Sequence, residues 1–151
     1  MKEVFTMWKS TKMIVLVALT AAIYAAILIP FKAIPIIPGF TELRPGNMIP
    51  VAFGLFFGPA GAWGTAIGNT IGDLLGGTIS WGSVFGFIGN FMFAYIPYKL
   101  WDNLGVLKTS ELEPDCKSPK KVSMYIMVSI VASAACGLWI AWGVDLLGFV
   151  P

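Results

Sequence analysis

Residues 45–98 carry a single charged side chain, Asp73, and this feature limits the possible folds more than any other. Long uncharged stretches are typical of chains that cross a lipid bilayer, where each helix needs about 20 apolar residues. The composition agrees, because 57% of the residues are hydrophobic and 12% are charged, whereas soluble domains have about 25% charged residues. The sequence therefore predicts an all-α fold, a polytopic transmembrane helical bundle.

Proline, glycine and charge divide the chain into five predicted helices within one transmembrane domain. Eight of the ten basic residues lie before residue 13 or within 99–121, and basic loops stay in the cytoplasm. An even number of membrane crossings must then separate these two regions. The predicted helices are at about 13–29, 46–57, 61–76, 81–98 and 122–143, with an external loop at 30–45 and a cytoplasmic loop at 99–121. We expect a multi-pass protein of the cell membrane with a cytoplasmic N-terminus.

The third predicted helix has a glycine at every fourth position, Gly64, Gly68, Gly72 and Gly76. Residues at this spacing share one helix face, and small residues on that face let a neighbouring backbone approach closely. We expect this face to pack against another helix.

A polar row, Thr65, Asn69 and Asp73, runs beside the glycines at the same spacing. A carboxylate at the bilayer centre costs about 2.5–3.5 kcal/mol, so it is rarely retained without a partner or a function. With the predicted topology, several polar and aromatic residues share the outer membrane depth with this row. The candidate substrate-binding residues are Glu42, Arg44, Asn47, Asn69, Asp73, Trp81, Asn90 and Trp139.

Each of these residues also has a structural interpretation. Asp73 and Arg44 could form a structural ion pair, and Asn69 could bond to a neighbouring helix. Trp81 and Trp139 could belong to the interfacial tryptophan belt of membrane proteins, where we also expect Trp101.

The first helix has alanines at spacing four, Ala18, Ala22 and Ala26. This smooth face suits contact with a second helix. The partner could be a separate scaffold protein or another helix of the same chain.

Composition argues against catalysis and metal binding. The chain has no histidine, the usual proton shuttle and nitrogen ligand, and its two cysteines, Cys116 and Cys136, lie in a charged loop and in an apolar run. We predict no enzymatic activity, no catalytic or metal-ligating residues, no cofactor and no nucleic-acid partner.

The run Ala18–Ala26, the proline-rich loop, Arg44 and the run Gly68–Asp73 resemble the substrate-binding S components of energy-coupling factor (ECF) transporters. The resemblance implies a membrane-embedded subunit of an ATP-driven importer, which captures a vitamin-like or heterocyclic micronutrient from outside. Its partners would be a transmembrane scaffold subunit, meeting the alanine face, and two cytoplasmic ATPase subunits. S components typically have six helices, so the resemblance also implies that a last helix is missing.

The alternative function is a small channel or a proton-coupled carrier that uses the polar row Thr65, Asn69 and Asp73. The short row and the lack of a second membrane carboxylate argue against a relay. The substrate is left open by the sequence. An acidic site suits a thiamin-like, pyridoxal-like or deazaguanine-like compound, whereas Arg44 suits a carboxylate.

Overall fold

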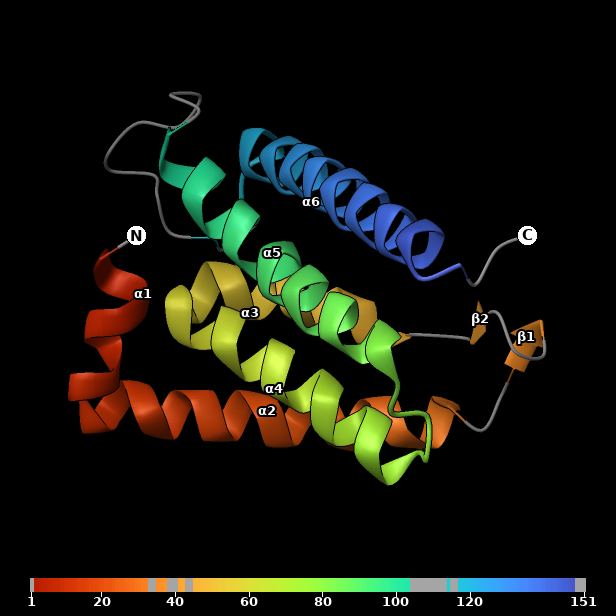
Figure 1. The fold of residues 1–151 in the computed structure, drawn as a ribbon. Helices are drawn as coiled ribbons and strands as arrows, with labels where there is room; N and C mark the ends of the chain where they lie inside the picture. The colour runs from red at the N-terminus through yellow and green to blue at the C-terminus, as the bar shows by residue number, and fades with distance from the viewer. Residues whose placement is uncertain are drawn as a thin grey trace.

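A computed structural model describes residues 2–32, 35–37, 41–42, 45–103, 114 and 117–148, and these form a helical bundle (Figure 1). The α-helices of the described residues are α1 (Lys2–Thr6), α2 (Thr11–Lys32), α3 (Met48–Phe57), α4 (Pro59–Leu75), α5 (Trp81–Asn103) and α6 (Pro119–Leu146). Two 3-10 turns, η1 (Met7–Lys9) and η2 (Pro45–Asn47), and a short antiparallel pair, β1 (Pro35–Ile37) with β2 (Thr41–Glu42), complete them. The predicted all-α bundle is confirmed.

The helices are arranged in layers around α4. Helix α4 lies between α2 and α5, α3 contacts both α4 and α5, and α6 packs on the outer side of α5 (Figure 1). Helix α1, the α3–α4 turn and the start of α6 lie at one end of the bundle, which we call the α1 end. Strands β1 and β2, the α4–α5 connection and the end of α6 lie at the other, the strand end.

Two of the described helices are long and apolar enough to cross a membrane by length and composition. They are α2, over Thr11–Phe31, and α6. Helix α3 is apolar but shorter.

The glycine row of α4 forms the contact with α2. A methyl group at Gly64, Gly68 or Gly72 would come within 3 Å of α2, closer than real side chains approach. The nearest atoms would be Cβ of Thr20 at 2.4 Å, the carbonyl oxygen of Ala21 at 2.7 Å and Cδ2 of Leu28 at 2.7 Å, respectively. The two helices therefore pack closely only because these positions lack side chains.

The break between α3 and α4 is confined to Gly58. This residue has φ +56°, ψ −128°, a left-handed conformation that glycine adopts without steric cost. Pro59 follows as the first helical residue, where its missing N–H leaves no helical bond unmade. Helix α4 thus begins two residues before the predicted 61.

The C-terminal ends of α2 and α5 also differ from the sequence-based expectation. Helix α2 continues through Pro30 to Lys32, inside the predicted loop, and α5 continues through Pro97 to Asn103. A proline near the end of a helix removes one backbone bond, and packing against neighbouring helices compensates. Helix α1 was not predicted, so the expected count of five helices is one short for the described residues.

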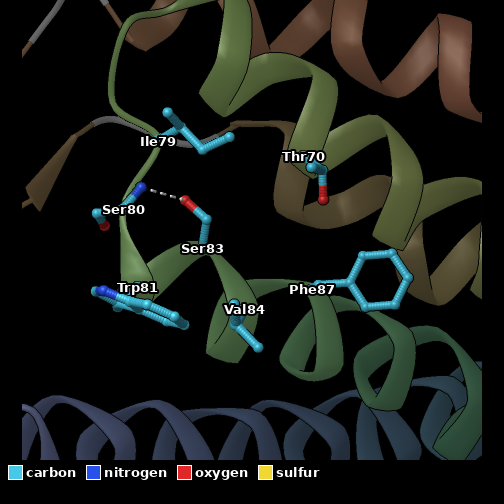
Figure 2. Close-up of a pocket in the computed structure, with 7 residues that line it drawn as sticks. All are labelled: Thr70, Ile79, Ser80, Trp81, Ser83, Val84 and Phe87. Carbon is cyan, nitrogen blue, oxygen red and sulfur yellow. Dashed lines mark hydrogen bonds between the residues drawn. The ribbon is translucent and has the colours of Figure 1, made fainter.

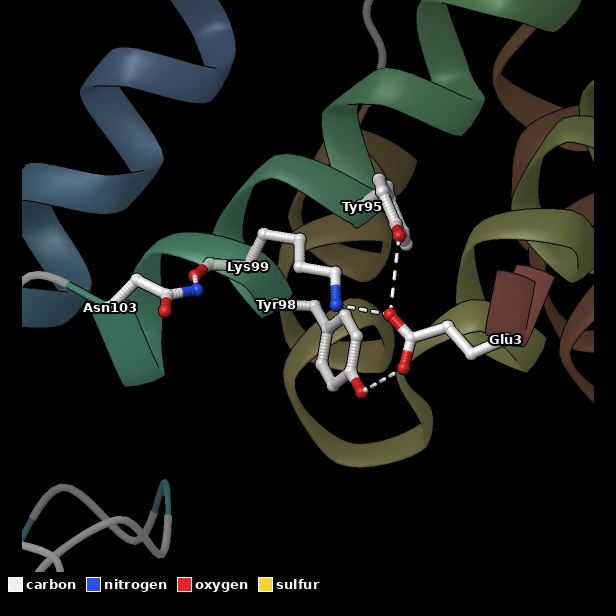
Figure 3. A network of polar contacts seen from close by, with 5 residues as sticks. All are labelled: Glu3, Tyr95, Tyr98, Lys99 and Asn103. Atoms are coloured by element: carbon white, nitrogen blue, oxygen red, sulfur yellow. Dashed lines mark hydrogen bonds and ion pairs between the residues drawn. The ribbon is translucent and has the colours of Figure 1, made fainter. Parts of the chain in front are cut away.

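Polar contacts fasten α1 to α5 at the α1 end (Figure 3). The Glu3 carboxylate forms an ion pair with Lys99 and accepts hydrogen bonds from the hydroxyls of Tyr95, at 3.3 Å, and Tyr98, at 3.4 Å. The Trp63 indole N–H on α4 donates to the carbonyl of Val4, at 3.1 Å. An ion pair and three hydrogen bonds therefore connect α1 to α4 and α5 at this end of the bundle.

Trp101 differs from its expected place in an interfacial belt. Its side chain is buried in a hydrophobic cluster with Met124 and Val128 of α6. The tryptophan thus packs α5 against α6.

Candidate functional site

The polar row of α4 is buried on the face beside the glycines. Thr65 is fully enclosed, Asn69 is 2% exposed and Asp73 is 7% exposed. A methyl group at Gly86 of α5 would lie 3.2 Å from Nδ2 of Asn69, so the row faces α5. One face of α4 thus packs closely against α2, and the neighbouring face presents polar groups to α5.

Asn69 and Asp73 line a cavity of about 190 Å³ towards the strand end, which we call the Asp73 cavity. Its walls come from α4, the α4–α5 connection, α5 and one residue of α6. The lining residues are Asn69, Asp73, Thr78, Ser80, Gly82, Ser83, Gly86 and Ile140. Amide, carboxylate and hydroxyl groups give this cavity a polar interior.

The Asn69 amide is incompletely bonded. Its Nδ2 donates to Oδ2 of Asp73 at 3.3 Å, whereas its Oδ1 is buried and has no hydrogen-bond partner among the described residues. A buried acceptor left unsatisfied costs about 1–3 kcal/mol. This oxygen would be satisfied by an N–H or O–H group inside the cavity.

A second cavity of about 210 Å³ contains Asn90, and we call it the Asn90 cavity. Asn90 accepts a hydrogen bond on Oδ1 from the Tyr24 hydroxyl, at 2.9 Å, and donates from Nδ2 to the Gly86 carbonyl, at 2.8 Å. The other lining residues are Asn47, Phe93, Ser133, Cys136, Gly137 and Ile140. The structure thus brings the predicted Asn47 and Asn90 together, in a different cavity from Asn69 and Asp73.

Trp81 is 75% exposed and borders a third pocket (Figure 2). This pocket is open, about 550 Å³ in volume and mainly apolar. Thr70 of α4 lies opposite Trp81 and Phe87 of α5, and Ser83 belongs to both this pocket and the Asp73 cavity. Trp81 therefore lies next to the Asp73 cavity and does not line it.

Trp139 packs between α5 and α6. Its indole N–H donates to the carbonyl of Phe85 at 3.1 Å, and its ring contacts those of Phe85 and Trp142. With its N–H used in this way, Trp139 holds the two helices together beside the cavities. Its contact with a substrate stays a prediction.

Two of the predicted substrate-binding residues, Glu42 and Arg44, are described only in part or not at all. Glu42 belongs to β2, opposite Pro35 in the strand pair, and nothing is described of its side chain. Arg44 lies outside the described residues. The alternative of an Asp73–Arg44 ion pair stays open.

The alanine face of α2 is exposed. Ala18, Ala22 and Ala26 point away from the bundle, whereas Ala21 and Ala25 are buried. Exposed apolar neighbours such as Val15 and Leu19 extend this surface. The three alanines thus do not serve the packing of α2 within the described bundle.

Sequence reasoning missed Ile140 as a cavity residue and Tyr24 as the hydrogen-bond partner of Asn90. Tyr24 is fully buried and carries the hydroxyl that orients Asn90, and Ile140 borders both cavities. A hydroxyl within an apolar run was a usable signal for Tyr24, because buried tyrosines need hydrogen-bond partners. An isoleucine in an apolar helix gives no such signal.

Apolar helices with small polar cavities between them are typical of membrane proteins that bind a solute between their helices. The chain belongs to the QueT transporter family, whose family model matches residues 14–150. This is a family of ECF-type S components, so the resemblance stated from the sequence is confirmed and the protein is a membrane transport protein for a micronutrient. No curated protein and no solved structure matched the chain.

Proposed function

We propose that this protein is the substrate-capturing subunit of an ECF importer and that its substrate is a queuosine precursor, a 7-deazaguanine. One observation carries the proposed site. The unpartnered, buried Oδ1 of Asn69 lies beside the Asp73 carboxylate in a polar cavity between helices. Membrane proteins rarely bury such acceptors without a function for them.

The hydrogen-bonding pattern of a deazaguanine suits these groups. Its guanine-like edge carries a ring N–H and an amino group side by side, which are donors. Asn69 and Asp73 offer acceptors at adjacent turns of α4, and carboxylate or amide acceptors are the usual partners of such base edges. The Asn90 Nδ2 group has a second N–H beyond the one that the Gly86 carbonyl accepts, since an amide nitrogen carries two donors, and this N–H would be available to a substrate long enough to reach Asn90.

Calorimetric titration of the purified protein tests the substrate. We expect saturable binding of 7-aminomethyl-7-deazaguanine, with thiamin and pyridoxal as comparison ligands. Binding of thiamin or pyridoxal in its place would refute the deazaguanine assignment and leave the proposed cavity standing.

The scaffold subunit would contact the exposed alanine face of α2, and two ATPase subunits would drive transport. Ala22→Trp places a bulky side chain in the centre of this face, so we expect it to abolish co-purification with the scaffold while substrate affinity is unchanged. Ala134→Trp is the matched control, because Ala134 is an exposed alanine of α6. Loss of substrate binding with intact assembly would contradict this assignment.

We propose that the α1 end faces the cytoplasm and the strand end faces outside. The N-terminal lysines and the start of α6, with Lys120 and Lys121, share the α1 end, as basic segments of the cytoplasmic side would. Cys116 lies outside the described residues but inside the predicted cytoplasmic loop. We expect an impermeant thiol reagent to leave Cys116 unlabelled in intact cells and to label it after permeabilisation, in a Cys136→Ser background.

The channel or carrier alternative receives less support. The Thr65 hydroxyl lies 3.0 Å from the Gly61 carbonyl and 3.1 Å from that of Ala62, within its own helix. The inner member of the polar row is therefore satisfied locally and fully enclosed. A proton or ion path would need this group to face water.

A further inference from the structure

The Asp73 cavity and the Asn90 cavity are neighbours. Both are bordered by Ile140 of α6. Gly86 of α5, which lines the Asp73 cavity, packs against Asn69 and accepts a hydrogen bond from Asn90 of the other cavity. The two cavities thus follow one another along α5.

Ile140 occupies the boundary because α5 has a glycine opposite it. A methyl group at Gly89 would lie 3.4 Å from both Cγ1 and Cδ1 of Ile140. The isoleucine side chain therefore rests on bare α5 backbone, next to Cys136 on the same helix. Ile140 is thus a shared wall of the two cavities.

The sizes of the two cavities suggest that they act together. At about 190 and 210 Å³, each is smaller than the roughly 300–1,000 Å³ usual for small-molecule sites. Taken together they reach that range. Each cavity also has its own amide groups, Asn69 in one and Asn47 and Asn90 in the other.

We propose that the two cavities are the two ends of one elongated substrate site and that Ile140 determines its specificity by limiting the length of the ligand. This inference rests on the proposed function. The ring edge of the ligand lies with Asn69 and Asp73, and a substituent on the ring points towards Ile140. A long substituent must displace the isoleucine to reach Asn90, so the native protein favours short ones.

Two deazaguanines of different length test whether Ile140 limits the length of the ligand. One is 7-aminomethyl-7-deazaguanine, and the other is queuine, in which the same amine carries a cyclopentenediol. Calorimetry gives the ratio of the two dissociation constants for each variant. We expect Ile140→Ala to shift this ratio towards queuine by at least about tenfold, or about 1.4 kcal/mol, while affinity for the shorter ligand changes by less than about threefold.

Two further variants keep the test decisive. Leu138→Ala is the control, because Leu138 lies on the same helix and is 73% exposed, and it should leave the ratio unchanged. Ile140→Val removes one carbon and should shift the ratio in the same direction by less, which covers the case that Ile140→Ala does not fold. Binding of neither ligand by the native protein would refute the proposed substrate. If the native protein binds but the ratio is unchanged in the Ile140 variants, only the proposed role of Ile140 is overturned.

Discussion

The two ends of the bundle each contain a carboxylate, and the two differ in what surrounds them. Glu3, at the α1 end, is 39% exposed and contacts the ammonium group of Lys99 and two tyrosine hydroxyls. Asp73, at the strand end, is 7% exposed, accepts a bond from Asn69 and borders a polar cavity. The first carboxylate fastens a terminal helix, and the second is positioned beside space that a solute can fill.

This difference separates a carboxylate with a structural role from one with a proposed binding role. A charge that water still reaches loses little on folding, so its ion pair contributes little to stability. A buried carboxylate in a membrane helix is costly, so the position of Asp73 beside a cavity supports the binding role that we propose for it. The comparison therefore predicts large effects on substrate affinity at the strand end and small effects on stability at the α1 end.

The largest effect on stability is expected at Gly68, where α4, the helix that carries the polar row, packs against α2. Gly68→Ala places a methyl group 2.7 Å from the Ala21 carbonyl oxygen and 3.1 Å from Cβ of Tyr24. Such overpacking typically costs about 1–3 kcal/mol, so we expect a clear fall in the melting temperature of the detergent-purified protein. Gly137→Ala is the control, since nothing lies within 4 Å of its added methyl group. Equal melting temperatures for both variants would contradict the close contact.

Asp73→Asn tests the strand end directly. The substitution keeps the size of the side chain and an acceptor for the Asn69 amide, but it removes the charge. We expect at least about tenfold weaker substrate binding, a loss of about 1.4 kcal/mol, in a protein no less stable than the native one, because burying the amide avoids the cost of a buried carboxylate. Titration calorimetry and thermal melting separate the outcomes. A large loss of stability would instead indicate that Asp73 is one half of a structural ion pair.

The sequence predicted the elements that depend on spacing along one helix. The glycine row, its polar neighbours Asn69 and Asp73, and the exposed alanine face all follow from residues that recur every fourth position. The structure places the glycines against α2 and the polar row against α5. The burial of the glycines and of Asp73 could be expected because small residues permit close contact and a membrane carboxylate needs a special environment. The alanine spacing left open whether its partner was a separate protein or another helix of the same chain.

Contacts between helices far apart in the sequence could not be predicted in the same way. Asn90 and Asn47 share a cavity, and Ile140 borders two, because of how α5 and α6 are placed against each other. The bond from Tyr24 to Asn90 joins residues on α2 and α5, and no periodicity within either helix indicates this pairing. Helix α1 is short and is stabilised by contacts with α4 and α5. Its own sequence is too short to indicate a helix, so it was not predicted.

Tyr24→Phe removes the hydroxyl that orients the Asn90 amide but leaves Asn90 itself in place. The variant loses the 2.9 Å bond to Asn90, and hydrogen bonds between membrane helices contribute about 0.6 kcal/mol on average. We expect a small fall in melting temperature together with a loss of affinity for queuine, the ligand long enough to reach Asn90, and this loss should be smaller than that caused by Asp73→Asn. An affinity equal to that of the native protein would show that the orientation of Asn90 does not matter to the ligand.

The smallest effect is expected from Glu3→Gln at the α1 end. The hydrogen bond and charge of Lys99 hold the pKa of the Glu3 carboxyl below its ordinary value of 4.5. A carboxyl whose pKa is lowered by folding stabilises the protein above the unfolded value, and this contribution disappears as the pH falls through the folded value. The native protein should therefore melt slightly above the variant at neutral pH, by less than the Tyr24→Phe difference, and the two should converge below pH 4.5. Substrate affinity at neutral pH should be the same in both, because Glu3 and the Asp73 cavity lie at opposite ends of the bundle. A loss of affinity comparable to that of Asp73→Asn would contradict the different roles proposed for the two carboxylates.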